Sequence, residues 1–430
     1  MNTNRWFALG LVVLVHADAA GANTLRRRAL PGFSIGDVAN GVGVVKGVVD
    51  GSPAFSAGLQ TGDRIDQAGD KPLVSTASLL AWMSALRDGD TVSVRVLREG
   101  GSRTLTFRPA PAPRDAEKGV SFSYEDVRNP VTGLRQRVIV SRPANAGGPV
   151  PFVFFVPWLS CDSVEVPPQA RGGIERLLYR IAATEGLGLV RVEKPGVGDS
   201  EGDCSRTDFE TELRGARAAF SFASSHPWFV GQRALAMGFS FSGSFLPRVA
   251  PAKEVAGYVF INSFVSTWFE RLIRFERKRL LASGETAAAA FEKVRRLSRV
   301  HLAVLEEGLT PAQAARRHRE LSGVWTDEPE HMYGRPLSFM RQLQATDAWA
   351  AWKDVDRPTL AVFGGADAVM HLDDHEQLVT AIDRNRPGAG RLILIPGADH
   401  SLSVPAAAAP RAQQLEDEMV AWMLTTLKDR

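Results

Sequence analysis

Ser240 is the serine whose surroundings best suit nucleophilic chemistry. It directly follows the apolar segment 234–239, a strand candidate. A serine hydroxyl is exposed as a nucleophile on a sharp strand-to-helix turn, where small residues two positions before and after it let the backbones approach. Gly238 and Ser242 fill those positions, so the sequence predicts Ser240 as the nucleophile. The alternatives are Ser242 as nucleophile, with Ser240 and Ser244 as its small neighbours, or a serine-rich helix cap.

An aspartate and a histidine follow two later strand candidates. Asp367 comes shortly after segment 359–363, and His400 comes shortly after segment 391–395. A histidine can take the serine proton as general base, and a carboxylate can orient that histidine. The sequence therefore predicts a triad of Ser240, His400 and Asp367. Rival acids and bases lie close by in the chain, namely Asp373, Asp374, Asp399, His371 and His375.

Acyl transfer also requires two N–H groups that receive the developing oxyanion. One is expected from Phe241, directly after the nucleophile. The other is expected from the loop after strand 152–156, where Pro157 has no N–H, so Trp158 or Leu159 must donate. The Trp158 indole is either a wall of the acyl pocket or a core side chain.

The elements that must position these residues alternate between strands and helices from residue 119 onward. Several strands are continuous apolar runs, as expected for a mostly parallel sheet covered by helices on both faces. The predicted strands are 137–142, 152–156, 187–192, 234–239, 257–261, 359–363 and 392–395.

The order serine, aspartate, histidine on successive strand ends resembles the α/β-hydrolase superfamily. The resemblance covers residues 119–430 and departs from the usual G-x-S-x-G pattern only at Ser242. Segment 193–202 resembles the Gly-x-Gly-x-Ser-x-Gly loop of such hydrolases rather than a dinucleotide fingerprint. The resemblance places Cys161 and Cys204 on neighbouring loops at the rim of the site, where we expect a disulfide; a catalytic cysteine is the alternative.

The long connection 264–356 is expected to be a helical lid over the site. Helices are predicted over 268–282, 286–305, 311–321 and 337–352. Many arginines and lysines make this segment basic, which either favours an acidic substrate or envelope surface or marks a solvated helix face. Tyr333 and Arg335 are candidates for substrate contact or for lid packing.

Residues 30–108 form a separate unit ahead of a proline-rich linker at 109–118. Strands are predicted at 42–49, 64–68, 91–97 and 104–108, with a helix at 75–86. Three motifs in order, at 51–54, 57–59 and 62–65, resemble a PDZ domain of the bacterial HtrA type. The resemblance implies binding of a peptide C-terminus by added-strand pairing. Pro31 interrupts the expected carboxylate-binding loop 30–33, so a packing or positioning role is the alternative.

Residues 1–22 have the features of a secretory signal: Arg5, an apolar run at 6–15, and small residues that fit A-x-A cleavage sites. A buried N-terminal helix is the alternative. The run is too short to span a bilayer, so we expect no stable membrane insertion and a periplasmic or secreted protein.

The composition narrows the class further. The 430 residues carry 51 Lys and Arg against 48 Asp and Glu, a net charge of +3, so we expect no nucleic-acid partner. The two cysteines exclude an iron–sulfur cluster or a cysteine-rich zinc site, and no metal or organic cofactor is implied. The leading hypothesis is a serine esterase acting on a small ester. The alternatives are a peptidase or amidase on the same triad, and a non-catalytic binding protein that uses the PDZ-like domain.

Overall fold

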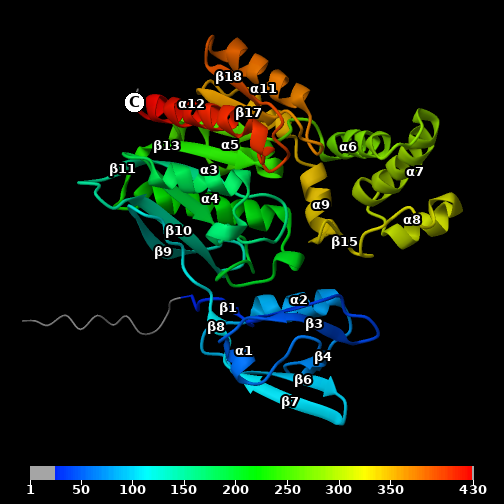
Figure 1. Cartoon of the computed structure of the whole chain (residues 1–430). Coiled ribbons are helices and arrows are strands. Elements are labelled where there is room, and N and C mark those ends of the chain that lie inside the picture. Colours follow the sequence, from blue (N-terminus) through cyan, green and yellow to red (C-terminus); the bar gives the residue numbers. More distant parts are fainter. Residues whose placement is uncertain (1–24, 429–430) are drawn as a thin grey trace, which may run out of the picture.

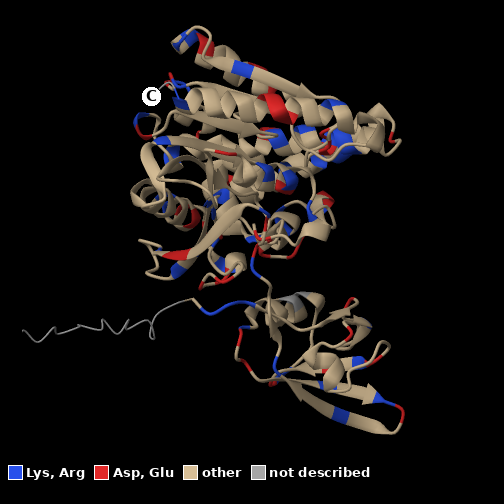
Figure 2. Cartoon of the chain, turned by 60° about the vertical axis from the view of Figure 1, so that its left-hand side comes forward, with Lys and Arg blue, Asp and Glu red and all other residues tan. Residues whose placement is uncertain are grey.

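The computed structural model describes residues 25–428 and contains two domains (Figure 1). The predicted signal segment 1–22 lies outside the described residues. Lys and Arg residues are interspersed with Asp and Glu residues along the ribbon of both domains (Figure 2). Between residues 25 and 428, no helix is both long and apolar enough to cross a membrane.

The smaller domain is an antiparallel sheet with two helices. Its strands lie in the order β2-β3-β4-β6-β7, with β5 paired to β4, so β2 is an edge strand. Inward-facing Val94 and Val96 on β6 pack with Leu79 of α2 in its core. The elements are β1 (Ala29–Leu30), β2 (Phe33–Ile35), β3 (Gly43–Val48), α1 (Pro53–Ser56), β4 (Arg64–Ala68), β5 (Lys71–Pro72), α2 (Thr76–Ala85), β6 (Val92–Arg98), β7 (Gly101–Phe107) and β8 (Ala110–Pro111).

The larger domain is built on an eight-stranded sheet in the order β18-β17-β14-β13-β11-β12-β10-β9. Six neighbouring strands run parallel, namely β12, β11, β13, β14, β17 and β18. At one edge β10 pairs antiparallel with both β12 and β9. The strands are β9 (Val120–Arg128), β10 (Arg135–Pro143), β11 (Val150–Val156), β12 (Gly188–Val192), β13 (Phe229–Phe239), β14 (Gly257–Ile261), β17 (Thr359–Gly364) and β18 (Gly390–Ile395). The predicted α/β fold is thus present, and its mostly parallel sheet has an antiparallel edge.

Helices cover both faces of this sheet and create two apolar cores. Side chains of α3 and α12, such as Leu177 and Met419, fill one core. Side chains of α4 and α11, such as Phe220 and Leu378, fill the other. The covering helices are α3 (Gly173–Ala183), α4 (Phe209–Ser225), α5 (Leu246–Val249), α11 (Leu372–Asn385) and α12 (Ala409–Lys428).

The connection between β14 and β17 is largely helical, and its outer helices α7 and α8 project away from the sheet (Figure 1). Its elements are α6 (Trp268–Ala282), α7 (Ala287–Leu305), α8 (Pro311–Arg317), β15 (His331–Met332), β16 (Arg335–Pro336), α9 (Leu337–Gln344) and α10 (Ala348–Trp352). The single helix predicted over 337–352 is wrong. Asp347 caps a new helix by accepting the N–H of Ala350, and this divides the segment into α9 and α10.

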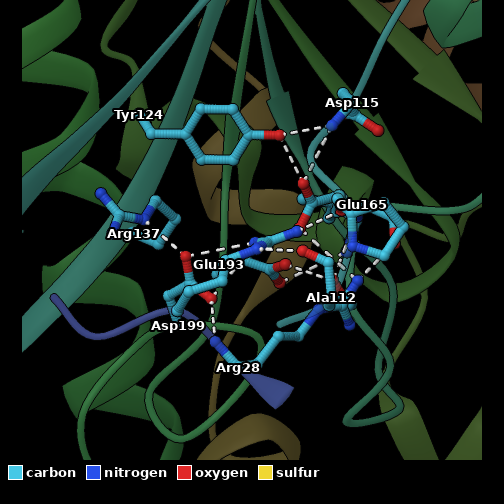
Figure 3. Close-up of polar contacts among 12 residues, drawn as sticks. Arg28, Ala112, Asp115, Tyr124, Arg137, Glu165, Glu193 and Asp199 are labelled. Carbon is cyan, nitrogen blue, oxygen red and sulfur yellow. Dashed lines mark hydrogen bonds and ion pairs between the residues drawn. The ribbon is translucent and has the colours of Figure 1, made fainter. Parts of the chain in front are cut away.

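The proline-rich segment between the domains is anchored rather than free. Its β8 pairs with β1, and the Ala112 N–H donates to the carbonyl of Arg28. The Arg27 guanidinium donates to the carbonyls of Ala112 and Pro113 and forms ion pairs with two buried carboxylates of the larger domain, those of Glu165 and Asp199. Figure 3 shows these two carboxylates with the residues around them. Both chain segments that enter and leave the smaller domain are therefore held by one polar cluster.

Candidate active site

Ser240 occupies a strained turn between β13 and the 3₁₀-helix η3 (Ser240–Phe245). Its φ angle is +60°, a left-handed conformation that non-glycine residues rarely adopt. A Cβ atom at position 238 would lie 2.8 Å from the backbone of Gly243, so glycine is required where strand and helix approach. This geometry is that of a nucleophile elbow.

Ser242, the alternative nucleophile, is fully buried and already engaged. Its hydroxyl donates to the carbonyl of Val156 at 2.7 Å and accepts the N–H of Phe239 at 3.0 Å. The hydroxyl thus joins the elbow to the end of β11. The departure from the usual second glycine has a structural explanation, and Ser242 is not presented to a histidine.

His400 lies between Ser240 and Asp367. Its Nε2 is 3.0 Å from the Ser240 Oγ, and its Nδ1 is 2.8 Å from an Asp367 carboxylate oxygen. The Asp367 side chain is fully buried, whereas that of His400 is partly exposed. The structure therefore brings together the three side chains that the sequence singled out, in an order of contacts suited to proton transfer.

The Asp367 carboxylate is stabilised in its ionised form. Burial alone raises the pKa of this carboxyl, but His400 and the N–H groups of Met370 and Val369 hold the pKa below its ordinary value. An anionic carboxylate fixes the orientation of the imidazole and stabilises its protonated form.

Asn262, which the sequence did not single out, supports the histidine loop. Its amide nitrogen donates to the carbonyl of His400 at 2.7 Å, and its amide oxygen accepts the N–H of Gly364 at 2.8 Å. Its φ angle is +41°, a second left-handed position at the end of a strand. The sequence signal that could have identified Asn262 is its position as a polar residue directly after strand β14.

The rival acids and bases are used elsewhere. Asp399 accepts N–H groups of its own turn, Asp373 pairs with Arg274, and Asp374 accepts the N–H groups of Val265 and Ser266. The Nε2 of His375 is bonded to the N–H of Ser263, and that of His371 contacts the carbonyl of Arg271. Burial lowers the pKa of His375 to about 4.

The loop after β11 offers N–H groups to the site. In the described chain, neither the Trp158 N–H nor the Leu159 N–H donates to a protein acceptor. Phe241 is in the first turn of η3, where N–H groups have no intrahelical acceptor. Leu159 and Phe241 line a cavity together with Ser240. Phe241 and Leu159 are therefore the candidate donors to an oxyanion.

Two buried cationic side chains, those of Lys194 and Arg335, bind the backbone carbonyl groups of the loop after β11. The Lys194 amine donates to the carbonyls of Trp158 and Ser160, and the Arg335 guanidinium donates to the carbonyl of Leu159 at 3.1 Å. Burial lowers the pKa of Lys194 to about 8. Because a carbonyl and the following N–H point in opposite directions, these contacts set where the loop N–H groups point.

Arg335 was suggested by the sequence as a pocket residue. It lines neither of the two cavities whose walls include Ser240. It is fully buried and pairs with Glu212 of α4 at 2.5 Å. The ion pair with Glu212 keeps the guanidinium inside the protein, where it contacts the Leu159 carbonyl. The sequence could not show this pair, because Glu212 lies on a distant helix.

The predicted disulfide is confirmed. Cys161 and Cys204 are bonded, with their Cα atoms 5.9 Å apart. Cys161 lies in the loop that carries Leu159, and Cys204 lies beyond the loop that carries Lys194. The bond therefore ties together the two loops at the rim of the site and leaves neither cysteine free for catalysis.

Two cavities meet at Ser240. The insertion-side cavity, of about 200 Å³, has walls that include Phe241, Trp268, Arg271 and Tyr333. The histidine-side cavity, of about 390 Å³, has walls that include Trp158 and His400. A larger cavity, of about 550 Å³ between α6 and α7, is lined by neither Ser240 nor His400. In residues 25–428, no group of three or more His, Cys, Asp or Glu side chains is placed to hold a metal ion.

Comparison with known proteins identifies the smaller domain. Residues 29–108 match the family model of the PDZ domain. The chain is 33% identical over 110 residues to a serine protease Do-like HtrA of Lactococcus lactis subsp. lactis (strain IL1403), covering 26% of each chain. It is 33% identical over 72 residues to a probable periplasmic serine endoprotease DegP-like of Pseudomonas fulva (strain 12-X), covering 17% of this chain and 15% of the relative. The chain thus spans about a quarter or less of these relatives.

Among solved structures, the chain resembles Est1E from Butyrivibrio proteoclasticus, with 12% identity and a TM-score of 0.45. The alignment covers 71% of this chain and 99% of Est1E. The strand order of the larger domain, with a serine elbow at the end of β13, agrees with the α/β-hydrolase resemblance.

Proposed function

We propose that the larger domain is a serine hydrolase that cleaves an ester through an acyl-enzyme. The observation that carries this proposal is the continuous contact from Ser240 through His400 to buried Asp367, with heavy-atom distances of 3.0 and 2.8 Å. No other serine hydroxyl in the described chain contacts His400.

The proposed reaction has two halves. The Ser240 Oγ attacks the acyl carbon while His400 Nε2 takes its proton, and the N–H groups of Phe241 and Leu159 receive the oxyanion. The intermediate collapses, the bond to the leaving alcohol breaks, and His400 returns the proton to that oxygen. Water then attacks the acyl carbon while His400 takes its proton, the bond to Ser240 breaks as His400 returns that proton to the Ser240 Oγ, and the acid leaves.

An ester is the proposed substrate because an alcohol leaves more readily than an amine. The PDZ domain is the observation that favours a peptidase or amidase as the second candidate, since such domains bind peptide ends. Its edge strand β2 supports a further proposal, that a peptide C-terminus binds there as an added strand.

The test compares p-nitrophenyl esters of several chain lengths with aminoacyl p-nitroanilides. Ester turnover that disappears in Ser240→Ala, with unchanged circular dichroism, is the expected result. Ser242→Gly is the matched control, because it restores the common pattern and should retain turnover. Anilide turnover equal to ester turnover would favour the peptidase. No turnover, or activity that survives in Ser240→Ala, would reject the proposed esterase.

We further propose that segment 264–356 acts as a lid, since Trp268 and Tyr333 from this segment wall the cavity beside Ser240. Export to the periplasm or the medium is also proposed. The disulfide supports it, because such bonds persist in oxidising compartments. Identification of the mature N-terminus by mass spectrometry of the exported protein tests this.

A further inference from the structure

Arg271 of α6 is a buried cation at the wall of the insertion-side cavity. Its side chain is 2% exposed, although it belongs to a segment whose other basic residues mostly face solvent. Its guanidinium lies over the Trp268 ring, 4.1 Å from the centroid, and 5.6 Å from that of Phe275. The same cavity contains Ser240. The positively charged guanidinium of Arg271 is therefore shielded from solvent and lines the same cavity as Ser240.

This guanidinium lacks a carboxylate partner in residues 25–428. The acids that face it are Glu276 and Asp367, and neither forms an ion pair with it. Glu276 pairs with Arg279 at 2.7 Å, and Asp367 is bonded to His400. The side chain of Tyr333 is its hydrogen-bonding neighbour.

Two buried donors at this wall are unused. The Nε atom of Arg271 and the indole nitrogen of Trp268 have no hydrogen-bond partner in the described chain. Burying a guanidinium without an anion is unfavourable, and the contact with an aromatic ring offsets this only in part. A guanidinium that lines the cavity and has no carboxylate partner among residues 25–428 matches a ligand that is acceptor-only and anionic, as a carboxylate is.

The reaction geometry decides which part of the substrate meets Arg271. His400 must protonate the leaving oxygen, so the alcohol belongs on the histidine-side cavity, which His400 lines. The acyl chain then occupies the insertion-side cavity, whose walls near Phe241, Val369 and Met370 are apolar. Among the described residues, Arg271 is the one charged side chain in this wall and has no carboxylate partner, so the cavity suits one negative charge at the end of an apolar chain.

We propose that Arg271 is a specificity-determining residue that binds a carboxylate at the far end of the acyl chain, so that the preferred substrates are monoesters of dicarboxylic acids. This inference rests on the proposed esterase function. It assigns the binding of an acidic substrate to this one buried arginine rather than to the exposed arginines of segment 264–356.

The experiment compares mono-p-nitrophenyl adipate and pimelate with p-nitrophenyl hexanoate and heptanoate as neutral partners of equal chain length. The wild-type protein should have the higher kcat/KM with the carboxylate esters. Arg271→Gln should raise KM for these esters about ten- to a hundredfold and leave the neutral esters nearly unchanged. Arg271→Lys should recover part of the loss. Arg277→Gln, on the exposed face of the same helix, is the matched control.

Two outcomes would overturn the inference. One is equal kcat/KM for carboxylate and neutral esters in the wild-type protein. The other is an equal loss for both ester classes in Arg271→Gln with a lowered Tm, which would make Arg271 a structural residue. If Arg271 is a binding residue, Arg271→Gln should not lower the Tm of the protein, since the substitution removes an unpaired buried charge.

Failure of the esterase proposal is detected separately. If the wild-type protein hydrolyses none of the esters, calorimetric titration with monomethyl adipate decides the inference. Binding to the wild-type protein that is lost in Arg271→Gln supports the carboxylate site, and absence of binding to the wild-type protein rejects it.

Discussion

The guanidinium of Arg27 lies 2.6 Å from the carboxylate of Glu165, and this ion pair joins the segment before the PDZ domain to the segment that follows the Leu159 loop. The same guanidinium is 3.2 Å from Asp199, which belongs to the loop after β12. Arg137 and the backbone N–H of Arg28 also contact Asp199 (Figure 3). The PDZ domain is therefore attached at the loops that shape the site.

Arg27→Met should lower the free energy of unfolding by about 3 kcal/mol, because it leaves two buried carboxylates with fewer partners. Calorimetric unfolding measures this change. Arg26→Met is the matched control, since Arg26 forms an exposed pair with Asp90 and should contribute less than about 1 kcal/mol. Equal effects of the two substitutions would show that the buried ion pairs of Arg27 contribute no more to stability than the exposed pair of Arg26.

Lys194→Met should reduce kcat for ester hydrolysis about tenfold with little change in KM. The substitution removes the donor that holds the carbonyls of Trp158 and Ser160, so the Leu159 N–H loses its fixed direction. Steady-state kinetics with one ester measures both constants. Lys253→Met, at an exposed position, is the control. A change in KM alone would place Lys194 in substrate binding instead.

Loss of the disulfide should destabilise the protein by about 4 kcal/mol, because the bond closes a loop with a sequence separation of 43 residues. The double variant Cys161→Ser, Cys204→Ser should show this in thermal unfolding, and reduced wild-type protein should behave alike. We also expect a lower kcat, since the rim loops lose their tether. An unchanged Tm in both samples would contradict the prediction.

Glu193 should make stability depend on pH. Burial raises the pKa of this carboxyl to about 7, although the Ser163 hydroxyl and the Val164 N–H oppose the shift. Between about pH 4.5 and 7 the folded state binds the proton more tightly than the unfolded state, so stability is greatest below this window and falls as pH rises through it.

Glu193→Gln should remove this fall, of about 3 kcal/mol, and make the protein more stable than wild type at pH 8. Denaturant unfolding at pH 5 and pH 8 measures it. Glu185→Gln, at an exposed position, should keep the wild-type dependence. An identical slope in Glu193→Gln would assign the pH dependence to another group.

Much of the fold followed from local patterns. Continuous apolar runs placed the central strands, and strand β14 begins and ends at the predicted residues 257 and 261. Strand β9 was missed, because it is an edge strand whose half-buried side chains Val120, Phe122 and Tyr124 alternate with polar ones. The division between α9 and α10 was missed because helical spacing continues across a cap.

Local sequence was sufficient to position Ser240, Asp367 and His400, since each follows a strand and the carboxyl ends of parallel strands meet at one edge of a sheet. Only the tertiary structure decided the fate of the charged side chains. Arg335 is paired inside the protein, and Arg271 is buried without a counter-ion among residues 25–428. Whether a charge meets solvent, a partner or a cavity depends on elements that are distant in the chain, and local spacing carries no record of them.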